Sequence, residues 1–358
     1  MSKWYDGLNS FNPWKGLLYR DKYEMIARGE IPVPVQARID PTLKCPLSCK
    51  WCNSARYRGN KDELSAEHLH RVLEFIAHWG VKAVVWAGGG EPTYHPAFPE
   101  LLRHNAELRM DAAILSNGAV HNPETAALIG KYCRWAGISV DAGTAETYTE
   151  NKGCATFDLV TRNISIMAEN SDGQGVGYKF LIAPGNQHEI FEACKVAKEI
   201  GAHDFIARPA DLHHQGMTNE SMDVGDFDIL YIMEQFDKCH ALETDSFHVH
   251  TITHKFNEDF SHDKPFSQCY GAPLRLHIAT DGNVYFCDDQ YYQEEYCIGK
   301  HYPDPSMILA TWGGDKHKEL LYGNTPSKCS TRCCISNCCV LCERVVVNNE
   351  DPMCMNYP

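Results

Sequence analysis

The feature that most constrains the fold is an alternation of short β-branched runs with amphipathic helical stretches, which extends from Val33 to about Ala207. Such alternation is typical of βα units stacked on a parallel sheet. We expect strands at Val35–Ile39, Ala83–Ala87, Ala112–Leu115, Trp135–Val140, Val176–Ile182 and Asp204–Ala207. Six such units predict an α/β fold, a partial (β/α)6 barrel of TIM type, with its chemistry at the C-terminal ends of the strands.

Composition narrows the class of protein further. The chain has 358 residues, of which 44% are hydrophobic, so it can bury a large core with a smaller domain beside it. Its formal net charge of −14 leaves no excess of Lys and Arg for a phosphate backbone, which argues against general nucleic-acid binding. We find no signal peptide and no apolar segment long enough to span a membrane, and we therefore expect a cytoplasmic protein with no membrane partner.

We divide the chain into an N-terminal arm over 1–34, a core over 35–245 and a small cysteine-rich domain over 246–358. A helix is expected over Phe227–Leu242, with Cys239 in its apolar stripe. The polar stretch from Glu243 to Ser267 is interpreted as a linker, and its histidines as solvated side chains.

Cysteine is the most informative residue type, because a reducing compartment seldom keeps structural disulfides and 17 cysteines then point to metal. Cys45, Cys49 and Cys52 follow the first predicted strand with C-x3-C-x2-C spacing, so all three thiolates can face one cluster. A cubane [4Fe–4S] cluster normally takes four cysteines, and three leave one iron open to another ligand. The alternative is a zinc knuckle, which would need a fourth ligand nearby, and the candidate, Asn53, is a poor one.

Further polar residues end the next strands. Gly88-Gly89-Gly90-Glu91-Pro92-Thr93 follows the second, where glycines let the backbone approach a ligand and Glu91 can accept a hydrogen bond from an ammonium group. Ser116-Asn117-Gly118 ends the third strand. In the fourth, alternation puts Ser139 and Asp141 on one face, although Asp141 could equally be a helix cap.

Together these segments resemble the radical S-adenosylmethionine (SAM) superfamily, whose cysteine motif has this spacing with an aromatic residue, here Trp51, before the last cysteine. The resemblance implies an enzyme whose reduced [4Fe–4S] cluster cleaves SAM to a 5′-deoxyadenosyl radical, which abstracts hydrogen from substrate. Lys152-Gly153 stands where many relatives carry Arg-Gly, so the charge is kept without the bidentate fork. The cofactor contacts implied are Trp51, Gly89, Gly90, Glu91, Pro92, Ser116, Asn117, Ser139, Asp141 and Lys152.

The last 90 residues hold ten of the cysteines. Cys269 and Cys287 flank Gly282 in a C-x12-G-x4-C pattern, in which Asp281-Gly282 predicts the turn of a β-hairpin. The hairpin would bring the two flanking thiolates together. One or two structural zinc sites are the alternative to iron–sulfur clusters here.

This region resembles the SPASM extension of radical SAM enzymes, although Arg332 stands where its second quartet cysteine would be. The resemblance implies one or two auxiliary [4Fe–4S] clusters, the first held by Cys269, Cys287 and Cys342, with either Cys297 as the fourth ligand or the fourth iron open to substrate. The second would be held by Cys329, Cys333, Cys338 and Cys354, with Cys334 and Cys339 as replacements for their neighbours. By the same resemblance Asp288, with Asp289 as competitor, is a candidate general base for the substrate radical, and a plain hairpin aspartate is the alternative.

The motifs specify the cofactor far better than the substrate. Oxidation or cross-linking of a peptide side chain is the first hypothesis, and a dehydrogenase or epimerase of a sugar-like small molecule is the second. A non-catalytic iron–sulfur or zinc protein is the third. Only 34 residues precede the first strand, so a peptide-recognition domain would be a separate protein, or the substrate is small. An electron donor such as flavodoxin or ferredoxin is an implied partner.

Overall fold

The computed structural model describes two compact units of the chain. The described residues are 13–57, 59–172, 175–210, 226–253, 256, 266–323, 339–340 and 342–348. The first unit, here called the barrel unit, comprises Ile39–Glu74 and Ala83–Glu258. The second, here called the hairpin unit, comprises Met1–Arg38, Phe75–Lys82 and Asp259–Pro358. The predicted boundaries at 34 and 245 were drawn from sequence alone and stay predictions.

A parallel sheet forms the centre of the barrel unit. Its strands follow one another in chain order, each parallel to the next. They are β2 (Ala83–Trp86), β3 (Asp111–Ser116), β4 (Cys133–Ser139), β5 (Val176–Ile182), β6 (Asp204–Pro209) and β7 (His248–Thr251). The last residue of β1 (Gln36–Ile39) also belongs to this unit, and its carbonyl accepts a hydrogen bond from Ala87 N–H at 3.0 Å.

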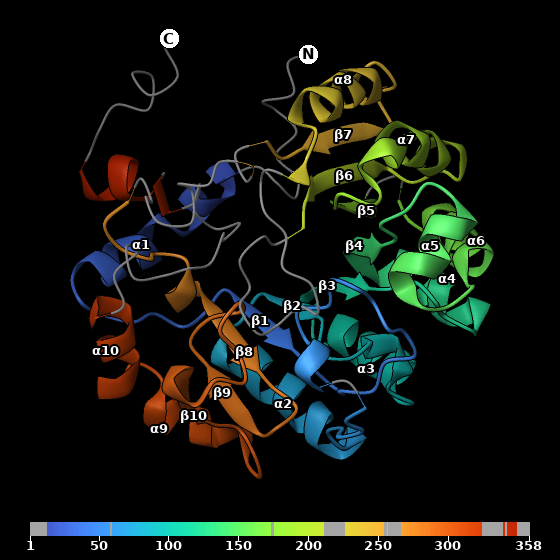
Figure 1. The fold of residues 1–358 in the computed structure, drawn as a ribbon. Helices are drawn as coiled ribbons and strands as arrows, with labels where there is room; N and C mark the ends of the chain where they lie inside the picture. The colour runs from blue at the N-terminus through green and yellow to red at the C-terminus, as the bar shows by residue number, and fades with distance from the viewer. Residues whose placement is uncertain are drawn as a thin grey trace. The chain divides into compact units, whose positions relative to one another are not determined.

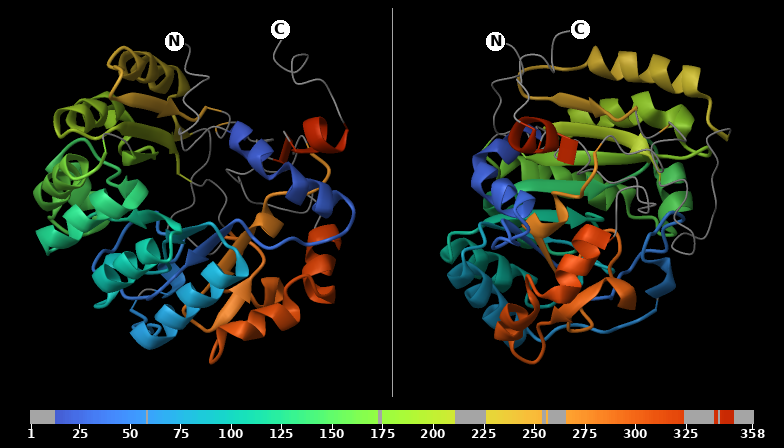
Figure 2. Two further views of the ribbon diagram at one scale, coloured as in Figure 1. Left: turned by 180° about the vertical axis from the view of Figure 1, so that it is seen from behind. Right: turned by 90° about the vertical axis from the view of Figure 1, so that its left-hand side faces the viewer.

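Helices connect these strands and lie along the outer side of the sheet (Figures 1 and 2). They are α2 (Ala66–Trp79, whose last turns belong to the hairpin unit), α3 (Phe98–Glu107), α4 (Pro123–Tyr132), α5 (Ala145–Lys152), α6 (Phe157–Glu169), α7 (Ile190–Glu199) and α8 (Ile229–His240). Short 3-10 turns occupy Ala55–Tyr57, Pro92–Tyr94 and Gln187–Glu189. Asn122, Thr144 and Asp228 begin α4, α5 and α8 by accepting hydrogen bonds from backbone N–H groups of the first turn. This partial βα barrel confirms the predicted fold class.

All six predicted strands are present, and a seventh that the sequence did not reveal is added. β7 lies within the polar stretch interpreted as a linker, and that interpretation is wrong for His248–Thr251. The strand is hard to detect because Val249 is its one buried side chain, and its stability comes from pairing with β6. His250 is not a free solvated histidine, since its Nε2 lies 3.1 Å from Asp204 Oδ1. Cys239 is fully buried in α8, as predicted.

In the hairpin unit, β8 (Arg275–Ile278) and β9 (Asn283–Tyr285) form the predicted hairpin, and β10 (Cys297–Lys300) pairs antiparallel with β9. Gly282 makes the turn with φ +85°, a value that favours glycine. The remaining elements of the unit are α1 (Arg20–Ala27), α9 (Ile308–Thr311), α10 (Asp315–Gly323), a π-helix over Cys342–Val347, and 3-10 turns at Pro13–Tyr19, Ala272–Leu274, Glu294–Tyr296 and Pro305–Met307. Within the described part of the chain, no helix combines the length and apolarity needed to cross a bilayer.

Candidate functional site

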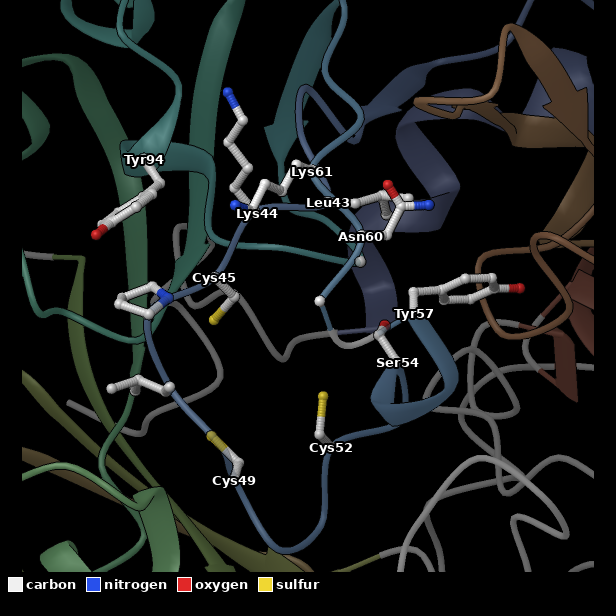
Figure 3. Close-up of a pocket in the computed structure, with 14 residues that line it drawn as sticks. Leu43, Lys44, Cys45, Cys49, Cys52, Ser54, Tyr57, Asn60, Lys61 and Tyr94 are labelled. Atoms are coloured by element: carbon white, nitrogen blue, oxygen red, sulfur yellow. The ribbon is translucent and has the colours of Figure 1, made fainter.

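The cysteine loop of the barrel unit follows directly after β1 and borders a cavity. Cys45, Cys49 and Cys52 all line this cavity, whose volume is about 250 Å³. Figure 3 shows their three sulfur atoms at the corners of a triangle around one space. Since a water molecule takes up about 30 Å³ of liquid, a group of several heavy atoms has room here.

Burial within the cysteine loop raises the pKa of two of its thiols. Although Cys45 is exposed toward the cavity, the protein atoms around its thiol raise the pKa to about 12, and the negative charge of Glu91 adds to that effect. Burial likewise raises the pKa of Cys49, while the cation of Lys152 opposes the rise. Thiolates are therefore costly here without a positive charge in the cavity, and bound iron would supply that charge.

The glycine-rich loop after β2 packs against the residues that lead into the cysteine loop. Gly90 N–H donates to the Thr42 carbonyl at 3.1 Å, and Glu91 N–H donates to the Lys44 carbonyl at 2.9 Å. A Cβ at Gly90 would lie 2.7 Å from the Thr42 carbonyl oxygen and 2.5 Å from the Leu43 carbonyl carbon. This approach of two backbones explains why glycine stands at position 90.

The carboxylate of Glu91 fastens this loop to the end of β3. Glu91 is buried, with 3% of its surface exposed. Its Oε1 accepts from Thr93 N–H at 3.1 Å, from the Thr93 hydroxyl at 2.8 Å and from the Ser116 hydroxyl at 2.8 Å. Its Oε2 accepts from Asn117 N–H at 2.7 Å. Burial nevertheless raises the pKa of Glu91, the four donors only moderating the shift.

Asn117 connects the third strand to the cysteine loop. Its side-chain amide donates to Cys45 Sγ at 3.8 Å, while its carbonyl oxygen accepts from Ala119 N–H at 2.8 Å. The ends of β1, β2 and β3 are thus joined through one chain of contacts: Cys45, Asn117 and Glu91. These contacts lie at the C-terminal ends of parallel strands, the edge where the sequence predicts the chemistry of the fold.

The donor set fits a cluster better than a single zinc ion. No three His, Cys, Asp or Glu side chains among the described residues lie close enough together to hold one metal ion. A zinc ion needs its ligands within about 2.0–2.3 Å, whereas cysteines of a cubane bind separate irons and stand farther apart. In addition, the buried indole N–H of Trp51 has no hydrogen-bond partner in the described part of the chain.

Asp141 and Lys152 form a buried ion pair. The Lys152 ammonium donates to Asp141 Oδ2, and both side chains are 4% exposed. β4 ends at Ser139, and Asp141 follows it with φ +60°, so strand alternation does not place Ser139 and Asp141 on one face. Asp141 is also not the helix cap, because Thr144 caps α5. Ser139 is half-buried at the end of β4.

Glu189 is a buried acid that the sequence analysis missed. Its Oε2 accepts from Gly143 N–H at 2.8 Å, and its Oε1 accepts from the hydroxyls of Thr144 and Thr147 at 2.8 and 2.7 Å. It therefore holds the first turn of α5 from the start of α7, where a negative charge suits the helix dipole. No local motif marks Glu189, because its partners lie more than 40 positions earlier in the chain.

The hairpin unit brings together part of the second predicted cysteine set. A hydrogen bond from the Cys339 thiol lowers the pKa of Cys269 to about 7, against the effect of burial. Burial raises the pKa of Cys287, and the charge of Cys269 contributes to that rise. Burial raises the pKa of Tyr270 to about 12, and the nearby charges of the buried Cys342 and Cys339 contribute to the rise. Cys297 donates to the Gly299 carbonyl at 3.4 Å, and Cys329, Cys333, Cys334, Cys338 and Cys354 lie outside the described residues.

Asp288, the predicted general base, is held by positively charged and aromatic neighbours of the hairpin unit. Its Oδ2 accepts from Arg275 at 2.8 Å, and its Oδ1 lies 3.6 Å from His277 Nδ1. Arg38 donates to the Asp288 carbonyl at 3.1 Å and stacks over the ring of Tyr291. The carboxylate is 14% exposed and follows directly after Cys287.

Comparison with known proteins agrees with this geometry. Residues 39–208 match the model of the radical SAM superfamily. Mycofactocin maturase MftC of Mycobacterium tuberculosis is 28% identical over 181 residues, which are 50% of this chain and 45% of that protein. The subtilosin biosynthesis protein AlbA of Bacillus subtilis is 24% identical over 179 residues, 49% of this chain and 39% of that protein. The chain thus spans less than half the length of these curated relatives.

Among solved structures, Streptococcus suis SuiB bound to its precursor peptide SuiA matches 87% of this chain and 71% of that chain, with a TM-score of 0.62 and 18% identity. The structure of anSMEcpe with bound AdoMet and the Kp18Cys peptide matches 86% of this chain and 88% of that chain, with a TM-score of 0.60 and 16% identity. At such identities the likeness shows the fold alone. Residues 39–208 are thus similar to the radical SAM superfamily, and the barrel and the cysteine loop of this segment agree with that similarity.

Proposed function

We propose that this protein is a radical SAM enzyme that oxidises or cross-links a side chain of a peptide. The observation that carries the proposal is the cysteine loop, whose three thiols line one cavity. Backbone hydrogen bonds join the residues that lead into this loop to the glycine-rich loop. Cys45, Cys49 and Cys52 would hold the [4Fe–4S] cluster. When bound there, the reduced cluster supplies the electron that cleaves SAM to methionine and a 5′-deoxyadenosyl radical.

The residues around the cavity would bind and orient SAM. Gly89 lines the cavity with the three cysteines and offers backbone groups to SAM, while Gly90, Glu91 and Pro92 fix the loop against the residues that lead into the cysteine loop. Trp51, whose indole N–H has no hydrogen-bond partner among the described residues, is a predicted contact as well. Ser116 and Asn117, at the end of β3, and Ser139, at the end of β4, are further predicted SAM contacts. Asp141 and Lys152 are predicted SAM contacts as well, although their charges already bind each other.

The hairpin unit would hold auxiliary iron–sulfur clusters of the SPASM type. Cys269, Cys287 and Cys342 are the proposed ligands of the first cluster. The hydrogen bond from the Cys339 thiol to Cys269 supports adding Cys339 to this set. Asp288 would take the proton that a substrate radical loses, at Oδ1, while Arg275 holds Oδ2. A donor such as flavodoxin or ferredoxin would supply electrons. We place the protein in the cytoplasm, because a reducing compartment keeps thiols available for iron.

A peptide substrate is favoured over a small molecule by the relatives. MftC and AlbA are named for mycofactocin maturation and subtilosin biosynthesis, and SuiB was solved with a precursor peptide. The chain spans 45% of MftC and 39% of AlbA, and the peptide class is our proposal for it.

The first test is cofactor cleavage by anaerobically reconstituted protein. With SAM and a strong reductant, it should form 5′-deoxyadenosine and methionine. Cys49→Ala should abolish this activity, whereas Cys133→Ala, which changes a buried core cysteine at the end of α4, should keep it. Wild-type protein that loads iron but cleaves no SAM would instead support a non-catalytic iron–sulfur protein.

The second test concerns the substrate. Candidate peptides with deuterium at the side-chain carbons should transfer it to 5′-deoxyadenosine, and deuterium transfer from a sugar-like molecule alone would overturn the peptide proposal. Iron analysis separates one cluster from several, since two or three cubanes require about eight to twelve irons per chain and a single cubane requires about four.

A further inference from the structure

The segment from Asp141 to Lys152 is hydrogen-bonded to the middle of the cysteine loop. Ser48 N–H donates to the Lys152 carbonyl and Lys50 N–H donates to the Asn151 carbonyl, both at 2.9 Å. These two N–H groups stand on either side of Cys49. The C-terminal carbonyls of α5 therefore fix the backbone that carries the second cysteine of the motif.

Hydrogen bonds of Asp141 connect this segment to the buried core. Asp141 Oδ1 accepts from Leu181 N–H at 2.7 Å, which ties the acid to β5. The carbonyl of Asp141 accepts from the side-chain amides of Asn151 and Asn186, both at 2.9 Å. The ion pair of Asp141 with Lys152 closes the arrangement, which we name the α5 clamp (Asp141, Asn151 and Lys152).

Lys152 also places a charge next to Cys49. Its ammonium donates to Asp141 Oδ2 with both side chains 4% exposed, and its backbone carbonyl accepts from the N–H of Ser48, the residue before Cys49. Lys152 and Asp141 carry opposite charges, so they act on a charge at Cys49 with opposite sign.

We propose that Lys152 is a positioning residue of the cysteine loop, which holds Cys49 in place through the α5 clamp and supplies a buried positive charge that raises the reduction potential of the cluster. The proposal rests on the proposed function, since it requires a cluster on Cys45, Cys49 and Cys52. A cation near an iron–sulfur cluster favours the reduced form, which carries one more negative charge. Lys152 contacts the cysteine loop through its backbone carbonyl, and its ammonium donates to Asp141 in the absence of SAM.

The opposite signs give a test that a purely structural role would not pass. Lys152→Met removes the cation and should lower the potential of the cluster. Asp141→Asn leaves the cation without its neutralising partner and should raise that potential. Loss of the clamp alone would shift both variants in the same direction, and that outcome would overturn the role of the charge.

The measurement uses anaerobically reconstituted full-length protein, titrated potentiometrically and followed by the EPR signal that changes when SAM is added, which separates this cluster from any in the hairpin unit. Lys152→Arg keeps the charge and should stay near the wild-type potential. The matched control removes an exposed ion pair of the same chemistry, Glu192 with Lys195 on α7, and should leave the signal unchanged.

Iron retention tests the positioning part. Lys152→Met should lose iron to a chelator several-fold faster than wild type, and faster than Lys152→Arg, in the absence of SAM. If Lys152→Met keeps the wild-type potential and iron retention and only weakens SAM binding, Lys152 is a SAM ligand and the proposal is wrong. A wild-type protein without any SAM-responsive signal would refute the proposed function itself, which is a different failure.

Discussion

Replacing Gly90 by alanine tests the contact between the two loops at the site. The added Cβ would lie 2.7 Å from the Thr42 carbonyl oxygen, 2.5 Å from the Leu43 carbonyl carbon and closer still to the Lys44 carbonyl. All three neighbours are backbone atoms, so no side chain can rotate away. The loops must separate, and the hydrogen bonds from the N–H groups of Gly90 and Glu91 would lengthen.

The expected cost follows from these contacts. Overpacking of a tight site costs about 1–3 kcal/mol, and two weakened backbone hydrogen bonds add about 1 kcal/mol each. Gly90→Ala should therefore lower the free energy of unfolding by about 3–5 kcal/mol, within the total of about 5–15 kcal/mol that holds a domain folded. Because the displaced residues lead into Cys45, the variant should also bind iron and SAM more weakly.

Urea unfolding of the anaerobic protein measures the first effect, and iron content with equilibrium SAM binding measures the second. Gly185→Ala is the matched control, since a Cβ there meets nothing within 4 Å, and it should change the unfolding free energy by less than about 0.5 kcal/mol. A Gly90→Ala protein as stable as this control, with full iron and SAM binding, would refute the argument that the loops are in contact.

Three further variants test individual groups. Glu91→Gln turns an acceptor into an NH2 group among four donors, so the unfolding free energy should fall by about 1–3 kcal/mol, with weaker SAM binding. Glu189→Gln removes the charge that holds α5 and should cost about 1–3 kcal/mol in the same assay; a variant as stable as wild type would contradict the role of Glu189. Burial lowers the pKa of His317 from 6.5 to about 4. Between these pH values the unfolded state binds more protons than the folded state, because its histidine has the ordinary pKa. The unfolding free energy of the wild type should therefore fall by about 3 kcal/mol as the pH drops from 6.5 to 4. His317→Asn should flatten this part of the stability profile, and an unchanged slope would contradict the assignment.

Comparison of prediction and structure separates two kinds of feature. The six strands and the hairpin turn at Asp281-Gly282 are confirmed, because each depends on periodicity or turn chemistry within a few neighbouring residues. β7 was missed, because its short polar sequence depends on β6 for stability. The predicted ligands and SAM contacts stay predictions, although the structure brings Cys45, Glu91 and Asn117 into one chain of contacts.

The sequence by itself determined the cysteine spacing, the glycine at a crowded turn and the order of βα units, since these are local properties of the chain. Only the tertiary structure decided which charges meet. Asp141 binds Lys152 and Leu181, and Glu189 binds the start of α5 more than 40 positions away. Such pairs form because the barrel brings distant strand and helix ends to one edge, and burial then requires each buried charge to find a partner. No spacing rule along the chain encodes that choice.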